Sequence, residues 1–358
     1  MTSPSIALVV DPRDPPPPWR LDLLGGALRA LGHPVVLQSG PSLDGADVVH
    51  AFGRRAAEEV LSRAAPGTAV VVSLREGSAD DLASAVDAVR RAAAVLLRSS
   101  ALSDRLVRAG VPQARAAVLP VGVDTETFTR RGAMANRTHR HRLVAELAAD
   151  PAALACAVEA VAADESVELV VLARHDAMRA LAEPAEHLRT AARAAGAGDR
   201  VVVAWPHDAR EKAWWIRSAH AALALDPAPG RPEFVAEAMA CGVAVVATPV
   251  EAQRDLVVHG VTGLHVREHD TAAVVHALRD LVADDFAVEA FGLAGSDRAL
   301  GRCSWERVAV ETASAYSRCL DSARGGQGSD ADDGPEEADE SDDEAPPARA
   351  EEAVARIA

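Results

Sequence analysis

The chain has 358 residues, of which 49% are hydrophobic and 25% are charged, and its formal net charge is −16 at pH 7. This length is enough for two ordinary domains with a core each. The net acidity, without a basic patch carrying interleaved aromatic residues, argues against nucleic-acid binding. No apolar run approaches the ~20 residues that a transmembrane helix needs.

The start of the chain predicts a strand and not a signal peptide. No basic segment precedes the apolar run of MTSPSIALVVD, which ends at Asp11. The four cysteines form no CxxC pair and no cluster with histidines. We therefore expect a reduced, cytoplasmic compartment, with no structural metal. No GxGxxG follows a strand and no GxxxxGK(S/T) is present, and we expect no cofactor.

Residues 1–125 alternate apolar runs with amphipathic ones, which predicts a parallel sheet covered by helices on both faces. The expected strands are Ile6–Val10, Val35–Leu37, Val48–His50, Ala69–Val72, Val95–Leu97 and Ala117–Leu119. The expected helices cover 19–31, 53–64, 78–91 and 100–109.

A second alternating block runs from about 143 to 300, after a basic, loop-like stretch from Arg130 to Arg142. Its clearest strands are VELVVL, RVVVAW, HAALAL and VAVVAT. Within it, 218–266 predicts strand, loop, helix, strand, turn, helix and short strand, the unit of a doubly wound sheet. Such sheets bind ligands beyond the carboxyl ends of their strands, here the 226–232 loop and the 248–252 turn.

The motif EAMACGVAVVAT, followed by QRDLVVHGVTGLHV, resembles the donor-binding half of the retaining glycosyltransferases of family 4. The resemblance continues in LVRAGVPQARAAVLPVGVDTETF and covers roughly 95–125 and 165–320. It implies an α/β protein of the GT-B fold, in which two Rossmann-like doubly wound domains face a cleft. The implied parts are 1–125 on the acceptor side, 126–300 on the donor side, and a helix at 301–322 that returns to the first domain.

The resemblance implies transfer of a hexose from a nucleotide diphosphate sugar to an unknown acceptor, with retention at the anomeric carbon. Glu237 matches the Glu that binds the ribose hydroxyls, a role that suits a carboxylate because it can accept from two vicinal hydroxyls. Without the motif around it, Glu237 would equally fit a solvated acid in a helix's first turn. The further donor-side candidates are Arg231, Glu233, Arg254, Thr248 and His207, and His50 is a weak catalytic candidate.

Several family positions are changed in this chain. Pro229 stands where a second Glu is expected, Phe52 replaces a His near the donor sugar, and 143–154 contains no basic residue where an Arg…Lys pair should face the diphosphate. Proline residues (Pro15–Pro16) occupy the place of a Gly-Gly loop, and Glu251-Ala252 that of another. Proline has no N–H to donate to phosphate.

These changes leave two hypotheses. The chain is a glycosyltransferase, or it is a catalytically inactive GT-B protein that acts as a nucleotide-binding or partner-binding scaffold. With the diphosphate side depleted of cations, we expect a nucleoside to bind about as well as the diphosphate sugar. The sequence favours packing over base stacking for Trp214 and Trp215.

The composition changes after Ser322, and 323–358 is expected to be a disordered acidic tail. Residues 330–358 hold −10 of the net charge, and such a segment cannot form a core. A solubilising role is the default, and a handle for a basic protein partner is the alternative.

Overall fold

The structure is a computed structural model that describes residues 3–10, 18–38, 45–65, 67–74, 79–148, 151–227, 230–268 and 270–325. The predictions about Pro15–Pro16, Pro229 and the acidic tail beyond Gly325 lie outside the described residues.

The first half of the chain forms a six-stranded parallel sheet in the order β2-β1-β3-β4-β5-β6. All five residues of β1 are buried, which is typical of a sheet covered by helices on both faces. The strands are β1 (Ile6–Val10), β2 (Val35–Gln38), β3 (Val48–Phe52), β4 (Ala69–Ser73), β5 (Ala94–Leu97) and β6 (Ala116–Val118). The helices are α1 (Pro18–Ala30), α2 (Arg54–Arg63), α3 (Ala79–Arg91) and α4 (Ser100–Arg108), followed by the short η1 (Gln113–Arg115).

The second half forms another parallel sheet, in the order β12-β11-β10-β7-β8-β9. Its strands are β7 (His141–Glu146), β8 (Val167–Leu172), β9 (Val201–Ala204), β10 (Ala221–Ala224), β11 (Ala244–Ala247) and β12 (Gly263–His265). Its α-helices are α5 (Ala155–Ala163), α6 (Met178–Ala194), α7 (Ala209–Arg217), α8 (Pro232–Ala240), α9 (Glu251–Leu256), α10 (Thr271–Ala283) and α11 (Asp285–Cys303). Two short 3₁₀ turns are η2 (Pro151–Leu154) and η3 (His175–Ala177).

The strand order of the second sheet places its ligand crevice. From β7 the chain builds outward through β8 and β9, and then returns to β10 on the other side of β7. The order therefore reverses between β7 and β10, and ligands of doubly wound sheets bind beyond the carboxyl ends at such a switch point.

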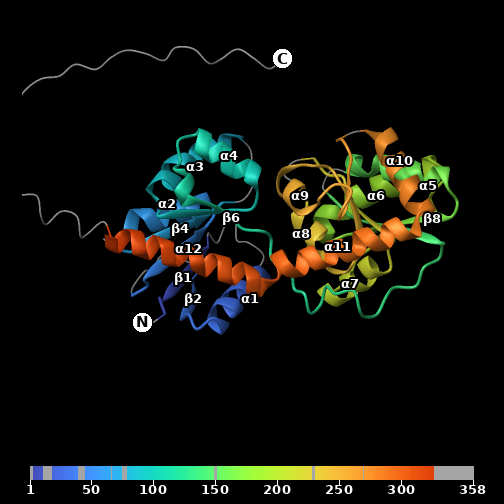
Figure 1. The fold of residues 1–358 in the computed structure, drawn as a ribbon. Coiled ribbons are helices and arrows are strands. Elements are labelled where there is room, and N and C mark those ends of the chain that lie inside the picture. Colours follow the sequence, from blue (N-terminus) through green and yellow to red (C-terminus); the bar gives the residue numbers. More distant parts are fainter. Residues whose placement is uncertain are drawn as a thin grey trace, which may run out of the picture.

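The two domains are joined twice, and the two connections touch. The backbone N–H of Val123, after β6, donates to the carbonyl of Cys303 at the end of α11 (2.7 Å). A Cβ on Gly122 would lie 2.5 Å from the ring of Trp305, so only glycine lets the linker pass this closely. Helix α12 (Trp305–Gly325) then lies along the first domain, where Trp305 and Tyr316 are part of its core (Figure 1).

The α/β fold with two doubly wound parallel sheets is as the sequence predicted. One boundary was wrong, because β7 begins at His141, inside the stretch read as a basic loop. The guanidinium of Arg142 is buried there and pairs with Glu168 at 2.8 Å, so a basic residue occupies a strand interior. Among the described helices none is both long and apolar enough to cross a membrane.

Candidate functional site

Helix α8 carries the residue that the resemblance identified, and it is buried on nearly all sides. Pro232 occupies its first turn, where the missing N–H costs nothing. The residues from Phe234 to Ala240 are all buried, so Glu237 lies in an apolar environment with 8% of its surface exposed. A carboxylate is found at such a position only with a charged partner.

That partner belongs to a chain of five charged side chains at the switch point. Lys212 of α7 places its Nζ 2.6 Å from Glu237 Oε2 and 2.7 Å from Glu146 Oε1. Arg231, just before α8, lies 2.9 Å from the other oxygen of Glu146 and 3.3 Å from Asp226 Oδ2. Because Glu146 ends β7 and Asp226 follows β10, the network occupies the crevice that the strand order predicts.

The network gives its members different pKa values. Burial lowers the pKa of Lys212, but the negative charges of Glu146 and Glu237 outweigh burial and raise that pKa overall. Lys212 is therefore an ammonium. Burial alone would raise the pKa of Glu146. The nearby cations Lys212 and Arg231 outweigh burial, so the pKa of Glu146 is lowered overall. For Glu237 burial wins over the attraction of Lys212, and its pKa rises to about 7. Glu237 therefore titrates near neutral pH.

Sequence reasoning missed Lys212, the only lysine of the chain. The signal was available, because Lys212 lies one turn before Ile216, on the side of α7 whose Ala213 and Ile216 are buried. Together with Arg231 it brings positive charge to the end of β7. There, the 143–154 segment itself supplies the acid Glu146 and no basic residue.

The other donor-side candidates lie in different settings. Thr248 is buried, and its Oγ1 donates to the carbonyl of Asp226 (2.8 Å), which ties the ends of β10 and β11 together. Arg254 is exposed and donates from Nε to the carbonyl of Pro249 (3.0 Å). His207 is exposed, and its backbone N–H donates to Glu211 (2.8 Å).

His50 lies in the first domain, and both of its ring nitrogens already have partners. Nδ1 is 2.7 Å from the Tyr316 hydroxyl of α12, and Nε2 is 2.7 Å from Ser73 Oγ. Its ring stacks on Phe52 with centroids 4.2 Å apart. Burial lowers the pKa of His50 to about 3, so the ring is neutral. As placed, His50 anchors α12 to the sheet.

Trp215 has the packing role that the sequence favoured. It packs against the core of the second domain, with the Arg142 guanidinium 5.1 Å from its ring centroid. Trp214 is 42% exposed.

Glu233 joins the two domains through ion pairs. It lies in the first turn of α8, and its Oε1 accepts from the guanidinium groups of both Arg20 and Arg98. Arg20 belongs to the first turn of α1, and Arg98 follows β5 directly. Glu233 is thus an interdomain ion-pair partner.

A second interdomain contact joins α4 to α9. Asp255 accepts from the backbone N–H (2.6 Å) and the hydroxyl (2.7 Å) of Ser100. Glu251 pairs with Arg105 at 3.1 Å and accepts from Ser99 Oγ at 3.2 Å. The negative charge that the sequence placed beside the expected diphosphate is therefore paired with the first domain. Glu251 has φ 41°, a strained value for a non-glycine residue, and these two contacts hold it.

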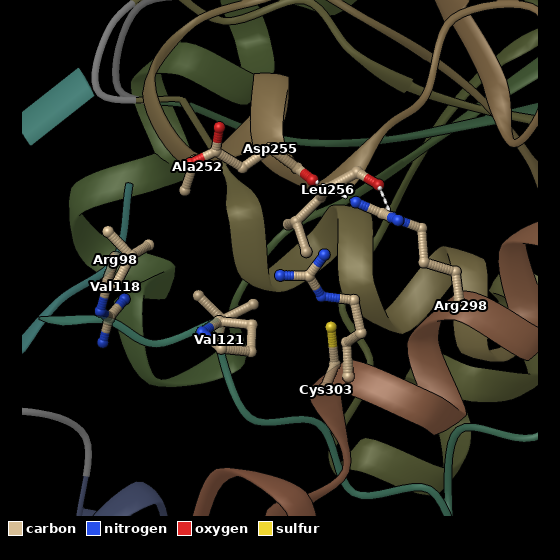
Figure 2. A pocket seen from close by; sticks show the side chains of 10 residues that line it. Arg98, Val118, Val121, Ala252, Asp255, Leu256, Arg298 and Cys303 are labelled. Atoms are coloured by element: carbon tan, nitrogen blue, oxygen red, sulfur yellow. Dashed lines mark hydrogen bonds between the residues drawn. The ribbon is translucent and has the colours of Figure 1, made fainter. Parts of the chain in front are cut away.

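A pocket lies where α9, α11 and the linker meet (Figure 2). Val121 and Leu256 contribute apolar side chains to it, and Arg98 lines it as well. The Arg298 guanidinium donates to the backbone carbonyls of Leu256 (2.8 Å) and Asp255 (2.7 Å) and so fixes the end of α9. Within the described part of the chain, no three His, Cys, Asp or Glu side chains are grouped to hold a metal ion.

Comparison with known proteins supports the motif-based resemblance. Residues 142–284 match the sequence model of the family "Glycosyl transferases group 1". The D-inositol 3-phosphate glycosyltransferase of Xylanimonas cellulosilytica is 32% identical over 221 residues, which are 56% of this chain and 51% of that protein. The alpha-maltose-1-phosphate synthase of Mycobacterium tuberculosis is 30% identical over 255 residues, 64% of each chain. The matches thus span about half to two thirds of these relatives.

Solved structures share the whole fold at low sequence identity. Sucrose-phosphate synthase from Thermosynechococcus elongatus superposes with a TM-score of 0.73 at 18% identity, over 89% of this chain and 100% of that one. HepE of Anabaena, solved with UDP, gives a TM-score of 0.72 at 16% identity, over 88% and 100%. The fold is GT-B, and residues 142–284 match the glycosyl transferases group 1 model. The family resemblance stated from the motifs is confirmed.

Proposed function

We propose that this protein is a glycosyltransferase that moves a hexose from a nucleoside diphosphate sugar to a hydroxyl acceptor with retention. The observation that carries the proposal is the position of Glu237. It lies within the segment that matches the family model, buried on α8 beside the crevice between β7 and β10.

In this proposal, Glu237 accepts hydrogen bonds from the two ribose hydroxyls of the donor. Lys212 fixes the orientation of its carboxylate from one side, at 2.6 Å. In the transfer, the bond between the anomeric carbon and the diphosphate breaks, and the acceptor oxygen bonds to that carbon. The hydroxyl proton is released, and the nucleoside diphosphate leaves. The leaving group gains negative charge, so cations near α8 stabilise the transition state.

The relatives suggest which compounds to test first. HepE was solved with UDP and with UDP-glucose, and the names of the curated relatives contain an inositol phosphate and a maltose phosphate. We therefore take UDP-glucose as the first donor, with phosphorylated polyols and sugars as the first acceptors. The four cysteines are all unpaired, which supports the proposal of a reducing, cytoplasmic location.

The test is a transfer assay followed by mass spectrometry and ¹H NMR. The protein is incubated with UDP-, GDP- and ADP-sugars and a panel of acceptors, and each new glycoside is assigned its anomeric configuration. The proposal predicts a product with the donor's configuration that is lost in Glu237→Ala. An inverted product would refute retention. Binding of a donor without transfer to any acceptor would favour the inactive-scaffold alternative.

A further inference from the structure

Arg20 and Arg98 come from separate elements of the first domain and meet at one atom of the second. Arg20 starts from α1 and Arg98 from the carboxyl end of β5, and both guanidinium groups bind Glu233 Oε1. The side chain of Arg20 is 9% exposed and that of Arg98 is 22% exposed. Two cations held this firmly around one oxygen form an anion-binding geometry.

The position of Glu233 relative to Glu237 suggests which ligand could bind the two arginines in place of Glu233. The two acids are four residues apart on α8, so their side chains project from the same face, about 6 Å apart along the axis. Glu233 is the one nearer the helix N-terminus. A nucleotide whose ribose binds Glu237 extends its phosphates toward that N-terminus, where backbone N–H groups and the helix dipole also favour negative charge.

A diphosphate suits two arginines better than one carboxylate oxygen does. Each guanidinium presents a planar fork of N–H donors that matches two oxygens of a phosphate or carboxylate. On Glu233 the two arginines share a single oxygen. A diphosphate offers each arginine its own pair of oxygens and carries more charge.

We propose that Arg20 and Arg98 form a diphosphate-binding site on the first domain, and that Glu233 is an internal anion that occupies it until the donor arrives. The proposal rests on the proposed function for the identity of the ligand. The two arginines supply the positive charge that 143–154 lacks on the diphosphate side of the site. The proposal therefore reverses the expectation that a nucleoside binds as well as the diphosphate.

A second consequence is that the ligand competes with a side chain of the protein itself. Glu233 must leave the arginines before a diphosphate can bind them. Its neutral variant Glu233→Gln therefore raises the affinity for diphosphate, although it removes an interdomain ion pair. A purely structural role for the ion pair predicts no such gain.

The experiment is calorimetry on the full chain with inorganic pyrophosphate, uridine and UDP as probes. The wild-type protein should bind pyrophosphate, and Arg98→Gln should weaken this binding about tenfold, the effect of losing one charge-assisted hydrogen bond. Arg20→Gln should do the same, and Glu233→Gln should tighten binding about tenfold. Arg63→Gln is the matched control, because Arg63 is exposed at the last turn of α2 and pairs only loosely with Glu59 at 3.3 Å.

The probes separate this inference from the proposed function. If pyrophosphate binding depends on both arginines while uridine and UDP do not bind, the anion site stands and its assignment to a uridine nucleotide falls. If UDP binds with the same affinity in wild type, Arg20→Gln and Arg98→Gln, the anion site is refuted and the proposed function survives. Thermal melting of each variant shows that it is folded. Should Arg20→Gln fail to fold, Arg98→Gln and Glu233→Gln decide the question through their opposite signs.

Discussion

Replacement of Lys212 by Met removes a cation that contacts both Glu146 and Glu237. The methionine side chain fills a similar volume without charge, so the change isolates the electrostatic contribution. Glu146 keeps Arg231 at 2.9 Å, but Glu237 loses the ion-pair partner at 2.6 Å. Breaking a buried ion pair by removing one partner costs about 3–5 kcal/mol in the free energy of unfolding.

The stability lost in Lys212→Met should depend on pH, and the direction of this dependence follows from the pKa of Glu237. In the wild-type protein Glu237 has a pKa of about 7 and releases its proton between pH 6 and pH 8. Without Lys212 its pKa rises further, so the folded variant keeps that proton at pH 8. Stability falls with rising pH wherever the folded state holds more protons. The variant therefore loses about 1.4 kcal/mol more at pH 8 than at pH 6, one pKa unit's worth.

Urea unfolding of both proteins at pH 6 and pH 8 measures this. Arg210→Met is the matched control, because Arg210 is an exposed residue on the same helix, and it should change stability by less than about 0.5 kcal/mol. The double variant with Glu237→Gln should lose the additional pH dependence. The reasoning is refuted if Lys212→Met costs less than about 1 kcal/mol, or if its deficit is larger at pH 6 than at pH 8.

Three further outcomes are expected. Nucleoside affinity measured by calorimetry should rise about tenfold from pH 6 to pH 8, because a charged Glu237 accepts more strongly from ribose hydroxyls. A pH-independent affinity equal to that of Glu237→Gln would contradict this. Asp255→Ala removes both hydrogen bonds to Ser100, so the two domains of the ligand-free protein should move apart and the radius of gyration in X-ray scattering should increase. An unchanged scattering curve would show that this contact does not hold the domains together. Tyr316→Phe leaves His50 Nδ1 buried without its partner and should cost about 1–3 kcal/mol in urea unfolding, and unchanged stability would show that the bond contributes nothing.

Much of the fold could be predicted because its strands are buried on both faces. Runs such as Ile6–Val10 and Ala244–Ala247 are wholly apolar, so they stand out between amphipathic helices. The rule fails where a polar residue is buried with a partner distant in sequence. Arg142 is such a residue, since its guanidinium binds Glu168 and Ser218, and the start of β7 was missed for that reason.

The candidate site was only partly visible in the sequence. Glu237 was found through a contiguous motif, but its partner Lys212 lies 25 residues away along the chain. Glu146, the other carboxylate that Lys212 binds, lies 91 residues away from Glu237. Glu233 and Glu251 were named, but their pairing with arginines of the first domain was missed. Arg20 and Glu233 are 213 residues apart, and no local pattern relates them. Ion pairs between domains depend on how the domains meet, which periodicity does not encode.

The most direct test of the central claim is donor binding at Glu237, measured by isothermal titration of UDP-glucose, GDP-mannose and ADP-glucose into the wild-type protein and into Glu237→Ala. The account predicts that at least one of these donors binds the wild type, and that the same donor loses a hundredfold or more in affinity when the carboxylate is removed. Absence of binding at millimolar concentrations for all three, or equal affinity of the two proteins for the donor that binds, would contradict it.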